Sequence, residues 1–241
     1  MSNLTRRNFL KSIGISAGAV AVGSYANWFG ISTVFAQEMG SNDDVQTILN
    51  LAATAELFAS THYLAAINGD LGLADKQVDY LKAGFLAEQD HLELLMSLGA
   101  EPVVTEFYVP PTLFSDSALF ATITEVAETT FVAAYLAATR IFAEAGETAF
   151  AVTTAQIAGV EAEHRALARQ IGGLLPNNIS YAQYQLNNVS DAVPVLQPFL
   201  DGSGDGFIGP VSPPTADDIA GIRDQAEMLG YDSTVLPFAA M

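Results

Sequence analysis

The sequence of 241 residues contains no cysteine, only three histidines and only nine basic residues. The absence of cysteine excludes disulfide bonds, iron–sulfur clusters, zinc–thiolate sites and catalysis by a thiol. Basic residues are so few that the net charge is −18 at pH 7. A surface this acidic repels nucleic acids and anionic membrane surfaces and attracts cations. We therefore expect no nucleic-acid partner.

The N-terminal segment has the pattern of an export leader. Residues 5–11 read Thr-Arg-Arg-Asn-Phe-Leu-Lys, which resembles a twin-arginine signal, and residues 12–36 carry no charge. Because small residues precede a good cleavage position after Ala36, we exclude residues 1–36 from the folded protein and expect no stable membrane span after cleavage. The alternative is an uncleaved anchor, since the uncharged stretch could cross a bilayer core of ~30 Å. The signal implies a periplasmic or extracellular location.

Two of the three histidines lie in a Glu-x-x-His step, one from Glu88 to His91 and one from Glu161 to His164. In a helix, residues three positions apart lie on the same face, so each step directs a carboxylate and an imidazole toward one point. Both steps lie in segments rich in alanine and leucine, which favour helix. With so few histidines in the chain, random placement does not account for two such steps.

An internal duplication relates the two steps. A shift of 72 residues overlays the text AE-x6-YLAA at 55–66 on the same text at 127–138. Each half therefore carries a lone glutamate, Glu56 or Glu128, and its Glu-x-x-His step begins 32 or 33 residues later. That separation is long enough for one helix to end, turn and run back. The duplication also selects Glu128 over the neighbouring Glu125.

The apolar periodicity and the capping residues predict an all-α fold: an antiparallel four-helix bundle over residues 43–173. The four helices are expected to begin after Asp43 or Asp44 and near Asp75, Ser117 and Thr148, and to end at Asn68, Gly99, Ala145 and Ile171. Short turns at 69–74 and near Gly146 join two antiparallel helix pairs. Residues 99–116 contain three prolines and form a long crossover between the second and third helices.

The composition changes after residue 173, where asparagine, glutamine, proline and glycine become frequent. Residues 174–241 are predicted to form a C-terminal extension that packs on the bundle. A capping sequence at Thr215 predicts a short helix that runs to about Leu229. Residues 201–208 resemble the start of an EF-hand loop, but Ser212 stands where a calcium-binding glutamate is needed, so we interpret them as a glycine-rich turn.

Six side chains lie on the inward stripes of the four helices, and a buried glutamate is costly unless a cation compensates its charge. We therefore predict a dinuclear metal site in which two glutamates bridge both ions and each histidine binds one. Carboxylate and imidazole ligands suit iron or manganese. The alternative is that these glutamates face solvent on ordinary amphipathic helices. The predicted ligands are Glu56, Glu88, His91, Glu128, Glu161 and His164.

Five further residues lie close to these ligands in the sequence. Tyr63 and Tyr135 follow the lone glutamates by seven residues and so lie on the same helix faces. They could donate hydrogen bonds to the ligands, act in electron transfer or simply pack in the core. Asp90 and Glu163 should point away from the site. His62 lies off the metal-binding stripe and is expected at the surface or at a helix end.

These residues resemble the exported bacterial ferritin-like domain proteins, some of which are called desiccation-related. The likeness includes both Glu-x-x-His steps, the lone glutamates with their tyrosines, and Gly206-Phe207-Ile208-Gly209-Pro210 in the C-terminal region. It implies a ferritin-like bundle with two iron or manganese ions that meet dioxygen or peroxide. The lack of cysteine departs from the rubrerythrins, whose rubredoxin iron centre needs thiolates.

Three functions are compatible with the sequence. The first is an oxidoreductase that oxidises iron or reduces peroxide or dioxygen. The second is a non-enzymatic envelope protein, associated with stress or desiccation, whose metal only ties the helices together. The third is a metal-free helical interaction module, which the duplicated ligand set disfavours. A homo-oligomer is compatible with all three.

Overall fold

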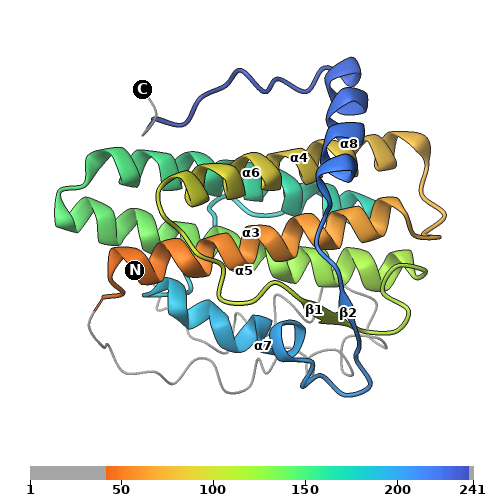
Figure 1. Cartoon of the computed structure of the whole chain (residues 1–241), viewed down its shortest axis with the longest axis horizontal. Helices are drawn as coiled ribbons and strands as arrows, with labels where there is room; N and C mark the ends of the chain where they lie inside the picture. Colours follow the sequence, from red (N-terminus) through yellow and green to blue (C-terminus); the bar gives the residue numbers. More distant parts are fainter. Residues whose placement is uncertain (1–41, 239–241) are drawn as a thin grey trace.

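The computed structural model describes residues 42–238, so the leader predicted at residues 1–36 lies outside the described part of the chain. Four long helices form an antiparallel bundle (Figure 1). They are α3 (Val45–Ile67), α4 (Asp75–Ser97), α5 (Ser117–Ala145) and α6 (Thr148–Ile171). The predicted all-α fold is therefore confirmed.

The helices begin and end where local chemistry favours it. The Asp44 carboxylate accepts a hydrogen bond from the Thr47 amide at the start of α3 (2.7 Å), and Asp116 accepts two from the first turn of α5. Such caps satisfy amides that have no partner within the helix. Gly146 ends α5 with a φ of 82°, a conformation that a side chain would strain. The short link to α6 then turns the chain back.

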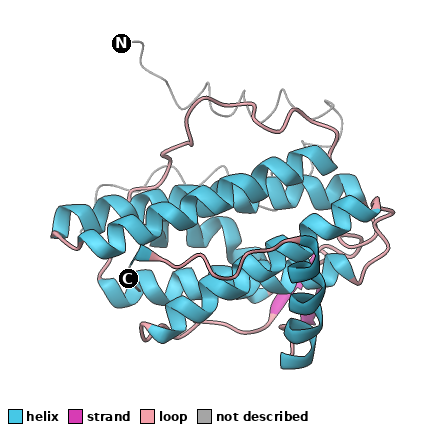
Figure 2. Ribbon diagram, turned by 90° about the horizontal axis from the view of Figure 1, so that it is seen from above, coloured by secondary structure: helices cyan, strands magenta, loops and turns pink. Residues whose placement is uncertain are grey.

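The crossover between α4 and α5 runs along α3. The Asn50 side chain accepts a hydrogen bond from the Glu101 amide, and the Thr54 hydroxyl accepts one from the Val103 amide, both at 2.8 Å. Further along, β1 (Phe107–Val109) pairs with the antiparallel strand β2 (Ile208–Val211) of the C-terminal extension. Figure 2 shows how small this sheet is beside the helices. The crossover is thereby held between the bundle and the extension.

The C-terminal extension wraps around the bundle (Figure 1). The short helix η2 (Val189–Ala192) packs against α3 and α5, α7 (Val193–Asp201) packs against β1 and places Phe199 on Phe58 of α3, and α8 (Ala216–Leu229) packs on α4. After α8 the chain turns back, and the Phe238 amide donates a hydrogen bond to the α6 residue Gln156. The stretch 202–207 connects α7 to β2 without a following helix, which agrees with a glycine-rich turn.

Among the described residues, α5 is the one helix long and apolar enough to cross a membrane. Most of its apolar residues are buried against the other helices, as in the central helix of a bundle. The core of the bundle contains Phe85, Phe120 and Ile123, none of which is exposed to solvent. The metal-binding stripes predicted from the sequence run through this interior.

Candidate metal centre

All six predicted ligands meet in the middle of the bundle, although they come from four helices. They form two overlapping groups, and within each group the potential ligand atoms lie within 4.8 Å of one another. Glu88 and Glu161 belong to both groups. Glu56 and His91 complete the first group, and Glu128 and His164 complete the second.

The four carboxylates of the cluster are buried. Glu88 and Glu161 have no exposed surface, and Glu56 and Glu128 are each 1% exposed. Moving a carboxylate from water into a protein interior costs several kcal/mol unless a cation or hydrogen bonds compensate it. Four such groups at one point therefore require positive charge.

The two histidines supply part of this charge. The His164 Nδ1 atom lies 2.9 Å from a Glu88 oxygen and 3.0 Å from a Glu161 oxygen. The His91 Nδ1 atom lies 3.3 Å from Glu161 and 3.6 Å from both Glu56 and Glu88. Two imidazole nitrogens are too few to balance the charge of four carboxylates.

Several buried atoms of the cluster make no hydrogen bond of good geometry in the described part of the chain, although the histidine contacts bring some of them to ion-pair distance. They are both carboxylate oxygens of Glu88, one oxygen each of Glu128 and Glu161, and Nδ1 of His91. Buried polar atoms are nearly always paired, so a group of orphaned atoms aimed at one centre is unusual. Oxygen and imidazole nitrogen donors in this number fit divalent iron or manganese. The cluster thus has the donor atoms of a metal site and lacks the positive charge that its carboxylates require.

The pKa shifts in the cluster also result from the burial of several charged groups close together. Burial, together with the nearby charges of Glu161 and Glu88, raises the pKa of Glu56 and Glu128 well above the usual range. Burial would raise the pKa of Glu88 too, but the charge of His164 and hydrogen bonds with Glu56, His164 and His91 together outweigh it and lower that pKa overall. Burial opposes protonation of His91 and His164, yet the carboxylates raise both pKa values. Without metal, protons must occupy this site.

The two tyrosines hold the lone glutamates crosswise. The Tyr63 hydroxyl from α3 donates a hydrogen bond to Glu128 on α5 at 2.5 Å, and the Tyr135 hydroxyl from α5 donates one to Glu56 on α3. Each half of the duplication therefore orients the glutamate of the other half. Both rings are buried, at 3% and 4% exposure. Of the roles considered from the sequence, hydrogen bonding to the predicted ligands is the one that the geometry supports.

The expectation that His62 lies at the surface or at a helix end is wrong. Its side chain is buried, its Nε2 atom lies 2.8 Å from the Thr124 hydroxyl, and its ring stacks on Phe120 with centroids 4.9 Å apart. The face of α3 beside the metal-binding stripe is covered by α5 and by Phe114 of the crossover, 5.6 Å from the His62 ring. Burial lowers the pKa of His62 to about 3, so the ring is neutral.

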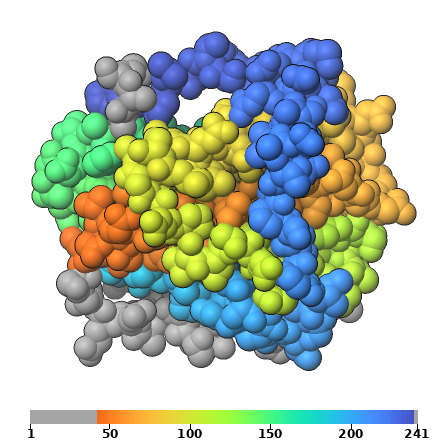
Figure 3. All heavy atoms as spheres, viewed as in Figure 1, coloured from red at the N-terminus to blue at the C-terminus, as the bar shows by residue number. Residues whose placement is uncertain are grey.

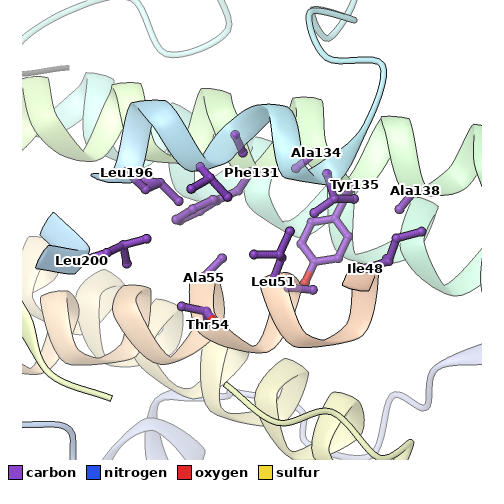
Figure 4. A pocket seen from close by; sticks show the side chains of 14 residues that line it. Ile48, Leu51, Thr54, Ala55, Phe131, Ala134, Tyr135, Ala138, Leu196 and Leu200 are labelled. Atoms are coloured by element: carbon purple, nitrogen blue, oxygen red, sulfur yellow. The ribbon is translucent and has the colours of Figure 1, made fainter. Parts of the chain in front are cut away.

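The duplication is broken beside the site. The histidine–threonine pair (His62 and Thr124) corresponds, by the shift of 72 residues, to an alanine pair (Ala134 and Ala52). The alanine pair lines a small apolar cavity of about 40 Å³ between α3, α5 and α7, next to Tyr135. Figure 4 shows Ala134 and Tyr135 facing α3 across this cavity. The histidine–threonine pair thus packs beside Tyr63 in one half of the site, whereas a small apolar cavity lies beside Tyr135 in the other half.

Three acidic residues close to the ligands in sequence do not face the cluster. Glu125 contacts Arg165 and Arg169 of α6, so the duplication chose the inward glutamate by selecting Glu128. Asp90 points away from the cluster, as predicted, and accepts a hydrogen bond from the Tyr231 hydroxyl at 2.7 Å. Glu163 is exposed. The contact to Tyr231 was not foreseen, because no pattern links a helix of the bundle to the distant C-terminal segment.

Comparison with known proteins agrees with this geometry. The sequence model of the ferritin-like domain matches residues 43–173, which is more than half of the chain and contains all six clustered residues. No curated protein and no solved structure matches the chain significantly.

Proposed function

Because the chain belongs to the ferritin-like domain family, we propose that it binds two iron or manganese ions at the buried cluster. One observation carries the proposal: four buried carboxylates converge with two imidazoles, and several of their atoms make no hydrogen bond of good geometry. A pair of divalent cations would neutralise the four carboxylates. The role of each ligand follows from the two overlapping groups.

The shared members of the two groups are the bridging ligands in this proposal. Glu88 and Glu161 would each contact both ions, because they lie in both groups. Glu56 and His91 would complete the first ion position, and Glu128 and His164 the second.

The chain's own residues prepare the site. Tyr63 and Tyr135 each fix one carboxylate by a hydrogen bond, which sets the oxygen that faces the centre. The bundle keeps bulk water from the carboxylates and holds the ligands on rigid helices. When bound, iron or manganese would supply redox chemistry toward dioxygen or peroxide. We propose that the protein oxidises iron or reduces peroxide or dioxygen on this basis.

We also propose that the protein acts outside the cytoplasm. The twin-arginine pattern of residues 5–11 supports this location. The test replaces Arg6 and Arg7 with lysine and follows the protein by cell fractionation. Export of the natural sequence together with retention of the lysine variant in the cytoplasm supports the proposal, and retention of the natural sequence in the cytoplasm would overturn it.

The test of metal binding begins with the mature protein after native export. Elemental analysis should give two iron or manganese ions per chain, and a chelator should remove them and lower the melting temperature. Less than one ion per chain, with no change in melting temperature on chelation, would contradict the proposal.

A second measurement separates an enzyme from a protein with a structural metal. The reduced, loaded protein is mixed with peroxide or dioxygen, and the absorption spectrum and the consumption of the oxidant are recorded. Turnover supports the oxidoreductase. Metal binding without spectral change or turnover would assign the ions a purely structural role in an envelope protein.

A further inference from the structure

The two ligand histidines line a large cavity that the metal site itself does not need. The cavity lies between α4, α6 and the segment 231–237, and its volume is about 440 Å³. A water molecule needs only ~10–15 Å³ by the same measure, so dioxygen or peroxide would occupy a small part of it. Figure 3 shows an opening beneath the dark blue C-terminal segment, next to the yellow α4. Its size falls in the range of sites for organic ligands.

The segment 231–237 forms a roof that is attached to both walls. At one end, Asp90 of α4 accepts hydrogen bonds from the Tyr231 hydroxyl at 2.7 Å and from Arg223 at 2.8 Å. At the other end, the Phe238 amide donates to Gln156 of α6 at 2.8 Å. A roof anchored on both sides leaves room for a small molecule beneath it and excludes a helix or strand of another protein.

The lining determines the kind of molecule that fits. The walls are mainly apolar, with Ala83, Leu94 and Ile157 from the helices and Val235 and Leu236 from the roof. Val235 and Leu236 are 73% and 55% exposed, so a ligand in the cavity would remove apolar surface from water.

The charges of the lining exclude anions. The acidic lining side chains outside the metal centre are Asp90, Glu163 and Asp232, and neither lysine nor arginine contributes to the lining. Asp90 is paired with Arg223, but a carboxylate or phosphate placed beside Glu163 and Asp232 would meet like charge, which disfavours fatty acids and phosphoesters there.

We propose that this cavity binds a neutral, mainly apolar organic molecule and presents it to the two metal-binding histidines. Its presentation to metal rests on the proposed function, whereas binding in the cavity does not. Three observations carry the proposal: the volume, the apolar acid-edged lining, and the position of His91 and His164 in that lining.

The test compares two dyes that share one ring system. N-phenyl-1-naphthylamine is neutral, and 1-anilinonaphthalene-8-sulfonate carries a sulfonate; both fluoresce in apolar surroundings. Titrated into the full mature chain, the neutral dye should bind with one dye per chain and at least tenfold more tightly than the sulfonate. Equal affinity for both dyes, or no saturable binding of the neutral dye, would overturn the proposal.

Matched variants locate the dye. Val235→Asn, in the roof, should weaken binding about tenfold, whereas Val103→Asn, an equally simple change at a 63% exposed valine of the crossover, should have no effect. Ala83→Trp should fill the cavity and abolish binding.

Melting curves confirm that the variants fold. Equal effects of both valine variants, or unchanged binding in Ala83→Trp, would contradict the assignment. So would monomer formation from a dimer in Val235→Asn, because a second copy would then be the occupant.

Metal substitution tests the link to the metal centre. Bound Co²⁺ quenches nearby fluorophores and bound Zn²⁺ does not, so the dye should be dimmer in the cobalt-loaded protein than in the zinc-loaded one. Equal brightness with both metals bound would refute the presentation to metal. If neither metal binds, the proposed function fails, while the titration of the metal-free protein still decides whether the cavity binds the neutral dye.

Discussion

The two halves of the metal centre have the same candidate ligands and different surroundings. In both halves a lone glutamate is held by a tyrosine from the other half, and a Glu-x-x-His step provides the remaining donors. Behind Tyr63, however, lies the histidine–threonine pair, whereas beside Tyr135 the alanine pair lines an apolar cavity. The comparison teaches that the ligand geometry is retained where both halves must contribute to one centre. The packing behind it differs because each half meets a different part of the crossover or extension.

The largest expected effect is at the glutamates that the two halves share. Glu88→Gln should reduce the metal content from two ions to nearly none, because Glu88 belongs to both ligand groups and in our proposal holds both ions. Glu56→Gln should remove only the ion on its own side. Elemental analysis of both purified variants measures the difference. Equal retention of metal by the two variants would show that Glu88 is not a bridging ligand.

The next comparison is between two glutamates of α5. Glu128→Ala should lose the ion of its half, whereas Glu125→Ala should keep both ions. The second variant leaves Arg169, which is 3% exposed, without its carboxylate partner and should lower the free energy of unfolding by about 1–3 kcal/mol. Metal analysis and urea denaturation check the two expectations. Equal metal loss would mean that the duplication selected the wrong glutamate.

Removing one tyrosine hydroxyl should have a smaller effect on metal binding. Tyr63→Phe and Tyr135→Phe each leave all ligands in place but release one carboxylate from its hydrogen bond. Partners of this kind typically contribute about 10–100-fold to metal affinity, so each variant should bind one ion about tenfold more weakly. Competition with a chelator of known affinity measures this. Unchanged affinity in both variants would reduce the tyrosines to ordinary core residues.

The smallest effect on metal is expected at the histidine–threonine pair. His62→Ala removes a buried ring and its contact with Thr124, and should lower the free energy of unfolding by about 2–3 kcal/mol without changing the metal content. Ala134→His, the mirror change, would test whether the cavity beside Tyr135 accepts a ring. Loss of metal in a folded His62→Ala protein would show that the pair supports the ligands after all.

Helical spacing and the duplication were sufficient to predict the bundle, its crossover and the convergence of the six side chains. The helical spacing is a local pattern and the duplication is a repeated one. Because helix geometry is regular, both patterns determine which side chains share a helix face. His62 was misplaced because the burial of a second face of α3 depends on the crossover and on α5, which spacing within one helix does not report. The contacts of Asp90 with Tyr231 and Arg223 were missed for a similar reason, since they join residues 133 to 141 positions apart.

Anomalous diffraction from crystals of the metal-loaded protein, recorded at the iron and manganese absorption edges, tests the central claim most directly. We expect two peaks inside the bundle, one between Glu56 and His91 and one between Glu128 and His164, with Glu88 and Glu161 between the peaks. No peak in the bundle of a crystal grown with excess metal, or peaks only at surface carboxylates, would contradict the account.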